Sequence, residues 1–234
     1  MLLEFPRIPY TASETPAGLT DSKLGGAPYR PVGTTWPTED SGQVLNFVAQ
    51  LNLAHVESDR QALALPPLFE GVLPTEGILQ FFLPFWEVYD SGPGIAHIEY
   101  FPTCDEPAQP PRIAWQPWEE DPLIWLTETA TPVEDHRALS SMLDFPCFPY
   151  KLTPKEAQPL IQVFDDIDDD ESSSQVGGVG TFVDSTPTSP VLFYLDSICE
   201  PVTIGDCGVM GFFIQQEALV KRDFRNVNLE VSLS

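Results

Sequence analysis

Hydrophobic and polar positions alternate with a period of two along residues 45–53. That period is typical of a strand that buries one face. Residues 78–85 form an almost unbroken apolar run, which instead predicts a central strand buried on both faces. The same patterns predict further strands at 97–101, 191–196, 208–214 and 227–231, and short helices at 54–65, 131–143, 153–164 and 217–223.

Proline and glycine interrupt the chain often, with 25 and 15 residues in a length of 234. Frequent interruption favours many short strands joined by turns over long helices. Residues 1–21 are rich in Pro, Thr and Ser and are expected to form an irregular arm. The length of the chain is sufficient to bury a full hydrophobic core.

Three short sequence blocks occur twice, in the same order along the chain. Ordered recurrence of this kind indicates an internal duplication. The two copies of each block are 22–26 and 174–178, 45–52 and 192–196, and 77–82 and 208–213.

The duplication predicts an α+β, β-rich fold in which two related sheet units pack face to face, with short helices at the periphery. Within each unit the apolar blocks should form adjacent strands: 44–53 beside 77–83, and 191–196 beside 208–214. We expect residues 1–234 to form a single globular domain. Its parts are a first repeat unit, a connecting insert with helices and an acidic loop, and a second repeat unit, at 22–90, 91–173 and 174–234.

The formal net charge is −24, from 35 acidic and 11 basic residues. Such a surface repels phosphate groups, so we expect no nucleic-acid partner and no binding to anionic membranes. Three interpretations of the charge remain open: solubility, complementarity to a basic protein partner, or a salty environment. The acidic run at 165–171 is expected to be a solvated, mobile loop.

The N-terminus carries an acidic residue and two early prolines in place of the basic and apolar regions of a secretory signal. The longest apolar run, at 78–86, is too short to span a bilayer. We therefore expect a soluble cytoplasmic protein. Its four cysteines are scattered and form no Cys-x-x-Cys pair. They are expected to be reduced and mostly buried, although the sequence leaves a disulfide open.

Several blocks resemble the YwqG-like family and follow that family's order from residue 22 to the C-terminus, whereas residues 91–165 match it loosely. The blocks are 23–31, 36–37, 47–53, 77–82, 205–214 and 222–224. The resemblance implies a bacterial, mostly β domain of the α+β class whose function is unknown. It supplies no activity, cofactor or catalytic residue that could be carried over.

Candidate motifs for cofactor or metal chemistry are incomplete. Gly177 and Gly178 lack the Lys-Ser/Thr ending of a phosphate-binding loop, and a tight turn explains them. The acidic run places Glu171 where a calcium-binding EF-hand loop requires Gly, and Gly177 where it requires Glu. The three histidines stand alone, without the spacing of a zinc site. We therefore expect no cofactor and no bound metal.

Two other arrangements are weaker still. Cys147 and His136 could act as nucleophile and base only if the fold brings them together. A tryptophan cluster at 115–125 could stack on a ligand ring, but aromatic residues near proline more often cover a core.

Five polar residues lie within or beside the apolar blocks. Because polar groups entering a core need hydrogen-bond partners, these residues either tie strands to backbone groups or line a polar cleft between the two units. The five are Gln50, Asn52, Gln80, Asp196 and Asp206. We predict a binding or interaction module with these residues as its candidate cleft, and no catalytic residue. The alternative is a hydrolase-like enzyme with a carboxylate and amide site at the junction of the units.

Overall fold

The structure is a computed structural model, and it describes most of the two sequence units and less of the insert between them. The described residues are 4–40, 42, 44–83, 94–104, 143–144, 149–155, 160–163, 174–180, 182, 190–197, 202–205, 207–225 and 227–232. The tryptophan cluster, the acidic run at 165–171 and all but the last residue of the helix predicted at 131–143 lie outside these residues, and that last residue, Leu143, lies in a strand.

Strands dominate the described part of the chain, with two short α-helices and one 3₁₀ turn. The strands are β1 (Glu4–Pro16), β2 (Lys23–Leu24), β3 (Asn46–Asn52), β4 (Ile78–Leu83), β5 (Gly94–Phe101), β6 (Leu143–Asp144), β7 (Tyr150–Pro154), β8 (Ile161–Val163), β9 (Ser174–Gly177), β10 (Val191–Asp196), β11 (Thr203–Ile204), β12 (Val209–Phe213) and β13 (Val227–Ser232). The helical elements are α1 (Leu53–Ala62), η1 (Leu68–Gly71) and α2 (Gln216–Val220).

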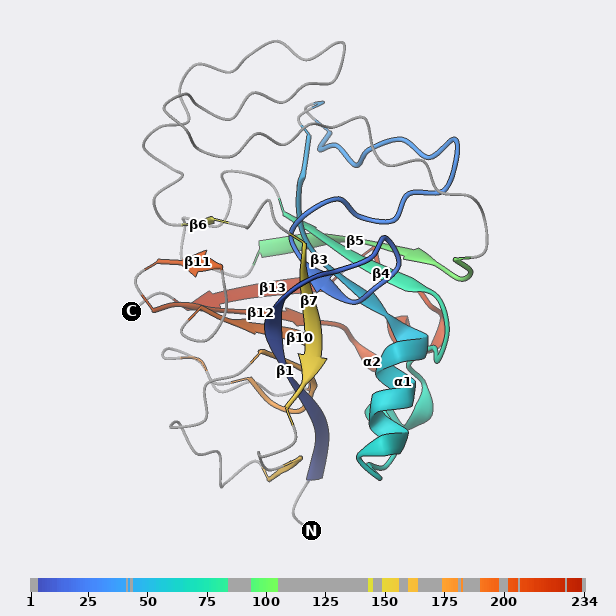
Figure 1. Ribbon diagram of the computed structural model, residues 1–234, viewed down its shortest axis with the longest axis vertical. Helices are drawn as coiled ribbons and strands as arrows, with labels where there is room; N and C mark the ends of the chain where they lie inside the picture. Colours follow the sequence, from blue (N-terminus) through green and yellow to red (C-terminus); the bar gives the residue numbers. More distant parts are fainter. Residues whose placement is uncertain are drawn as a thin grey trace.

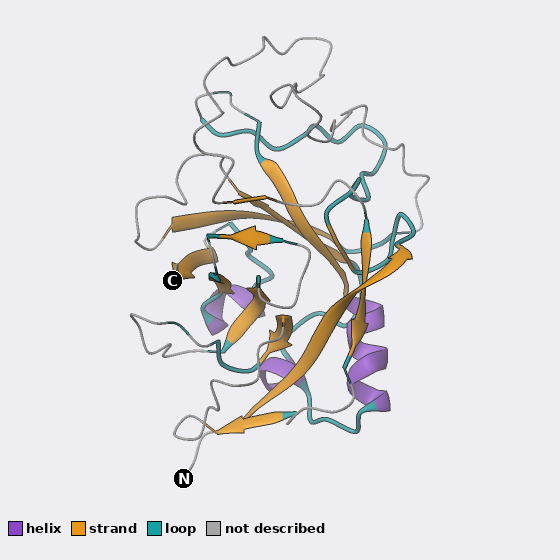
Figure 2. Ribbon diagram, turned by 60° about the vertical axis from the view of Figure 1, so that its left-hand side comes forward, coloured by secondary structure: helices purple, strands orange, loops and turns teal. Residues whose placement is uncertain are grey.

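Ten antiparallel strands close into one barrel, in the order β7-β2-β3-β4-β5-β13-β12-β10-β9-β1 and back to β7. Figures 1 and 2 show the strands curving around a common interior. β8 pairs with the first residues of β1 outside this ring, and β6 pairs with β11. The prediction of an α+β fold with two sheet units packed face to face is therefore wrong. The strands of the two units instead belong to one sheet, in which β5 lies between β4 and β13, and β1 and β7 lie between β9 and β2.

Closure of the barrel depends on β1, the segment for which we predicted an irregular arm. β1 pairs with β9 through residues 7–10 and with β7 through residues 10–16. Its prolines donate no backbone N–H, but their carbonyls still accept. Pro6 O accepts from Gly178 N at 3.0 Å, and Pro9 O accepts from Lys155 N at 2.8 Å. Strand pairing on both sides thus outweighs the local signal of proline, and closure leaves the ring without a free edge.

The closing partner of β1 also departs from prediction. The Thr153-Pro154 sequence predicts a helix start, yet Thr153 lies in β7 opposite Thr11 of β1. On its other side β7 pairs with β2. Ladder hydrogen bonds to two neighbours therefore override the local capping signal, as tertiary context commonly does.

Adjacent strand pairs occur where the repeated blocks predict them. β3 pairs with β4, and β10 pairs with β12, which confirms both predicted adjacencies. The two pairs also share one register, because Leu51 faces Leu79 and Leu195 faces Met210. Each pair has an irregularity at the same point, between residues 47 and 49 of β3 and between 191 and 193 of β10.

The barrel interior is an aromatic core drawn from both halves. Phe81 of β4 packs against Phe193 of β10 and Phe212 of β12, with ring centroids 5.2 and 4.9 Å apart. All three side chains are completely buried. Since strand side chains alternate between faces, Gln80, Tyr194 and Phe213 point out of the barrel, where the loop residues Arg30 and Phe182 cover them.

Candidate functional site

Two of the predicted cleft residues meet on the outer face of the barrel. Gln50 and Gln80 are fully buried and lie opposite each other on β3 and β4, where Gln80 Nε2 donates to Gln50 Oε1 at 3.0 Å. The Gln50 amide also accepts from Tyr29 N at 2.7 Å and donates to the carbonyls of Leu19 and Asp21. These bonds fit the structural alternative, in which the amides tie strands to loop backbone.

Asn52, in contrast, is the N-cap residue of α1. Its side-chain oxygen accepts from the N–H groups of Ala54 and His55, at 3.1 and 3.4 Å. Its own N–H donates to Ser22 Oγ at 2.9 Å. The cap starts the helix that follows β3, because it satisfies donors that a helix terminus leaves free.

Asp196 occupies the position of Asn52 in the other half of the barrel. It ends β10, and its N–H donates to Ser174 Oγ at 3.3 Å, as Asn52 does to Ser22. β4, β5, β13 and β12 separate β3 from β10 in the sheet order. Asp206 lies outside the described residues. A single cleft lined by all five residues therefore stays a prediction.

Arg30, which no sequence pattern singles out, is a buried cation beside Gln80. Arg30 Nη1 donates to Gln80 Oε1 at 3.1 Å and pairs with Glu99, and Nη2 donates to the carbonyl of Thr35. The guanidinium carbon also lies 5.4–5.9 Å from the centroids of three aromatic rings, those of Trp36, Phe82 and Phe101. Glu99 could have indicated a buried cation, because it is an acidic residue within the predicted strand at 97–101, and it faces Gln80 in the sheet.

Glu99 connects this network to the surface, since 27% of its side chain is exposed. Burial raises the pKa of Glu99, but hydrogen bonds from His97 and Arg30 and the charge of Arg30 outweigh burial. The pKa of Glu99 therefore lies below its usual value, and the carboxylate is charged at neutral pH. The result is a paired charge that anchors the loop carrying Arg30 to β5.

The other half of the barrel fills the corresponding place with an aromatic ring. Phe182 lies four residues after Gly178, as Arg30 lies four residues after Gly26. It packs on Tyr194 and Phe213 at centroid distances of 5.6 and 5.7 Å. The barrel can therefore cover this face without a charge, and the polar network distinguishes the first half.

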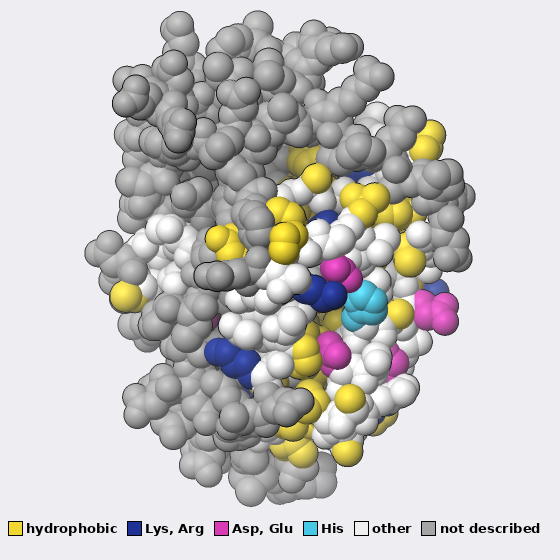
Figure 3. Space-filling model, in the orientation of Figure 1, with side chains coloured by type: hydrophobic (Ala, Val, Ile, Leu, Met, Phe, Trp, Pro, Cys, Tyr) yellow, Lys and Arg dark blue, Asp and Glu magenta, His cyan; other side chains and the backbone are white. Residues whose placement is uncertain are grey.

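A second group of charged residues lies where β2 and β7 meet α1. Lys151 Nζ is 3.3 Å from Asp21 Oδ2, and His55 Nδ1 is 3.9 Å from Asp21 Oδ1. Positive, negative and histidine side chains lie side by side on this face of the molecule (Figure 3). Behind them Lys23 is almost completely buried and donates to the carbonyls of Gly18 and Leu19 at 3.0 Å. Burial lowers its pKa to about 8.

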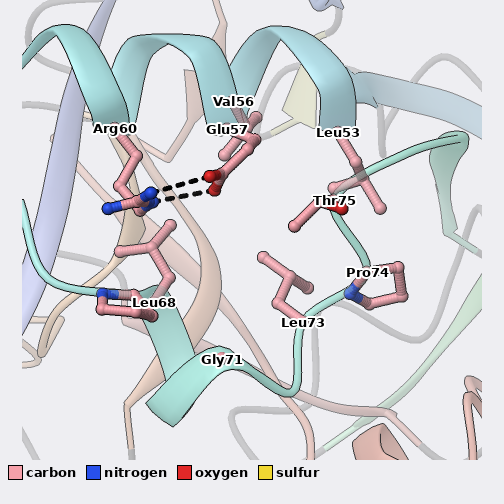
Figure 4. A pocket seen from close by; sticks show the side chains of 10 residues that line it. Leu53, Val56, Glu57, Arg60, Leu68, Gly71, Leu73, Pro74 and Thr75 are labelled. Atoms are coloured by element: carbon pink, nitrogen blue, oxygen red, sulfur yellow. Dashed lines mark hydrogen bonds and ion pairs between the residues drawn. The ribbon is translucent and has the colours of Figure 1, made fainter.

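An apolar pocket of about 200 Å³ opens between α1 and the segment that runs from Pro67 to Thr75. Figure 4 shows α1 along one side of the pocket and this segment along the other. The buried floor is Leu53, Val56, Leu68, Leu73 and Pro74, and the exposed rim is Pro67, Gly71 and Thr75.

Two charged side chains also line the pocket, and they are paired with each other. Arg60 donates from Nε and Nη2 to the two carboxylate oxygens of Glu57, at 2.8 and 2.7 Å (Figure 4). Arg60 Nη1 donates to the carbonyl of Leu65, and Gln61 donates to Glu57 at 2.7 Å. The Arg60 and Gln61 hydrogen bonds lower the pKa of Glu57 to about 2.

The segment that forms one side of the pocket contains strained backbone between the lining residues Leu68 and Gly71. Phe69, Glu70 and Gly71 are consecutive residues with φ of 49°, 55° and 82°. Left-handed conformation costs a non-glycine residue roughly 1–2 kcal/mol, so the first two positions are unfavourable. They are held between buried Leu68 and a hydrogen bond of 2.9 Å from Gln216 Nε2 to Glu70 Oε2. Strain of this kind concentrates at functional sites.

Within the described residues, no group of three or more His, Cys, Asp or Glu side chains is placed to hold a metal ion. None of the helices in the described part of the chain is long and apolar enough to cross a membrane. Of the cysteines described, Cys104 is half-buried and Cys207 is exposed, and both are free. The expectation of mostly buried thiols is wrong for these two.

Residues 22–232 match the family described as Domain of unknown function (DUF1963). The chain belongs to this family. A comparison with curated proteins found no match. The matched range contains the pocket, the Arg30 network and every strand of the barrel except β1, which closes the ring.

Proposed function

We propose that this protein is a binding module that takes one apolar side chain of a basic protein partner into the pocket beside α1. The observation that carries the proposal is the pocket, which has a buried apolar floor and an exposed rim. Apolar concave surfaces of this kind are the usual form of binding sites.

The volume of the pocket supports a single side chain as the occupant. Sites for drug-sized ligands measure roughly 300–1,000 Å³, which exceeds the 200 Å³ of this pocket. A dry apolar cavity of about 150 Å³ accepts a benzene ring. The pocket therefore has room for one large apolar side chain, with the rest of the partner lying over the rim.

The strained wall supports a role beyond packing. Phe69 and Glu70 both have left-handed backbone in the connection between α1 and β4. A backbone cost of roughly 2–4 kcal/mol for the two residues is retained in the segment that shapes the pocket. Strain held by the surrounding structure is a reason to assign function to this place over other surface loops.

Charge supports a basic partner. The whole chain carries a net charge of −24, and residues 53–77 contain four acidic residues and one arginine. That arginine, Arg60, is neutralised by Glu57. Glu70 and Glu76 lie close to the rim residues in sequence and are exposed. Lysine or arginine residues on either side of the apolar anchor would complement these carboxylates.

We also propose that the protein is cytoplasmic, that it is a bacterial member of the YwqG-like group, and that the one barrel contains an internal repeat. The repeat is supported by the common register of the β3–β4 and β10–β12 pairs. It is also supported by the matching bonds from Asn52 to Ser22 and from Asp196 to Ser174.

The test is selection of peptides that bind the wild-type protein from a random library, followed by measurement of how the enriched peptides bind the variant Thr75→Trp. An indole at this exposed rim position would plug the pocket and leave the floor intact. We expect enriched peptides with one apolar residue between lysines or arginines. Ser58→Trp is the control, because Ser58 is exposed on α1 and does not line the pocket. Enriched peptides that bind wild type and Thr75→Trp equally would contradict the proposal.

A further inference from the structure

We infer that the pocket selects an anchor without a polar end, such as leucine, methionine or phenylalanine, and rejects tyrosine and lysine. This inference rests on the proposed function, because it concerns the chemistry of the side chain that enters the same pocket. It follows from what the lining offers to an incoming group.

The side chains that form the floor of the pocket present only hydrocarbon groups. Leu53, Val56, Leu68, Leu73 and Pro74 carry no side-chain polar atom, and Pro67 and Gly71 of the rim add none. A hydroxyl or ammonium group that reached the floor would lose its water without gaining a partner. An unsatisfied buried polar group costs roughly 1–3 kcal/mol, and an unpaired charge costs more.

The charged residues of the lining do not relieve this cost. Arg60 uses Nε and Nη2 on Glu57 and Nη1 on the carbonyl of Leu65. Glu57 accepts from Arg60 twice and from Gln61 once. Their mutual pairing leaves them turned to each other at one side of the pocket (Figure 4). Three of the five N–H groups of Arg60 are thus already used, and a polar anchor would have to leave the floor for this side of the pocket to reach the others.

Thr75 is the remaining polar side chain of the lining, and it belongs to the exposed rim. Its hydroxyl is the side-chain group of the lining best placed to form a hydrogen bond with a tyrosine hydroxyl. Thr75→Val removes this hydroxyl and keeps the shape of the side chain, so it separates a contribution of Thr75 from a property of the floor.

The probes are five-residue peptides with blocked ends and the sequence Gly-Lys-X-Lys-Gly, in which X is Leu, Phe, Tyr, Lys or Ala. Dissociation constants are measured by calorimetry for wild type, Thr75→Val, Thr75→Trp and Ser58→Trp. We expect the Phe and Leu peptides to bind wild type and Ser58→Trp. The Tyr peptide should bind about 10- to 100-fold more weakly than the Phe peptide, and Thr75→Val should keep this difference.

The outcomes separate the two proposals. Tyr and Phe peptides that bind within threefold of each other, with both lost in Thr75→Trp, would overturn the selectivity and leave the pocket as the binding site. The selectivity would also be overturned if the Tyr peptide binds wild type as tightly as the Phe peptide and loses affinity only in Thr75→Val. In that case the Thr75 hydroxyl would form a hydrogen bond with the tyrosine hydroxyl. If the Ala peptide binds as well as the Phe peptide, or no peptide binds, both proposals are wrong.

Discussion

Arg30 and Phe182 hold corresponding places on the two halves of the barrel. Arg30 donates to Gln80 of β4 at 3.1 Å, whereas the ring of Phe182 lies over Gly211 of β12. Gly211 faces Tyr194 in β10 as Gln80 faces Gln50 in β3. One half therefore covers its outer face with a hydrogen-bonded charge and the other with an aromatic ring that needs a glycine beneath it.

The aromatic half should not tolerate a methyl group at position 211. In Gly211→Ala the new Cβ would lie 2.5 Å from Cζ of Phe182. Overpacking of this kind costs about 1–3 kcal/mol, which urea unfolding would measure. Phe182→Leu should recover part of the loss in the double variant, because it removes the nearest clashing atom and leaves the contact of 2.8 Å with Phe213 Cε2. A free energy of unfolding within about 0.5 kcal/mol of wild type for Gly211→Ala would contradict this packing.

The charged half should depend on Arg30 for stability. Arg30→Met removes the donor that Glu99, Gln80 and the carbonyl of Thr35 share, and breaking a buried pair costs about 3 kcal/mol. Arg30→Lys keeps the charge but lacks the planar fork that reaches three acceptors, so we expect a loss of about 1–2 kcal/mol.

The control for this prediction is Arg225→Met. Arg225 pairs with Asp223 but 84% of its side chain is exposed, so its removal should change the free energy of unfolding by about 0.5 kcal/mol or less. Equal effects of Arg30→Met and Arg225→Met would show that the buried network contributes no special stability.

Lys23 should make the protein more stable as the pH rises from 7 to 9.5. Its pKa is about 8 in the folded chain and about 10.4 when unfolded. Between these values the unfolded chain binds more protons, so the free energy of unfolding increases with pH, by about 2 kcal/mol over this interval. Urea unfolding at several pH values measures the slope.

Comparison of two lysine variants isolates the contribution of Lys23. Lys23→Met should flatten the rise, whereas Lys221→Met, at an exposed position, should keep it. The range ends at pH 9.5 because burial raises the pKa of Tyr10 well above 10, and its titration acts with the opposite sign above that value. An unchanged slope in Lys23→Met would contradict a charged, buried Lys23 at pH 7.

The strain in the pocket wall predicts an unusual response to glycine. Glu70→Gly places glycine at φ of 55°, which relieves the side-chain clash but adds freedom to the unfolded chain. The relief of strain, roughly 1–2 kcal/mol, should exceed this entropic cost and the loss of the exposed hydrogen bond from Gln216, which leaves a net gain of about 0.5 kcal/mol. Glu217→Gly, at an exposed position of α2, should instead lose about 1 kcal/mol. If both variants lose equal stability, Glu70 is unstrained.

The sequence predicted the strands of the barrel better than their arrangement. β3, β4, β5 and β13 fall at their predicted places because alternation and apolar runs are local signals. Barrel closure is a long-range property. It depends on β1, whose prolines indicate a loop, and on β7, whose Thr153-Pro154 sequence indicates a helix start. Neither local sequence signal contains information about the distant strands with which β1 and β7 pair.

The candidate site was predictable only in part. Gln50 and Gln80 could be found because they interrupt apolar strands, and their burial agrees with that signal. Arg30 lies in a loop with no periodicity, so nothing local indicated that it would enter the same network. The pocket joins a helix to a segment about ten residues further along the chain, and its shape depends on three successive left-handed residues that the sequence does not reveal.

The most direct test of the central claim is a methyl NMR titration with the Phe peptide Gly-Lys-Phe-Lys-Gly. We predict saturable shifts of the methyl resonances of Val56, Leu68 and Leu73, and unchanged resonances for Leu192 and Leu195 in the barrel interior. The shifts should disappear in Thr75→Trp and persist in Ser58→Trp. Absence of shifts in the wild-type protein, or equal shifts in Thr75→Trp, would contradict the pocket beside α1 as the binding site.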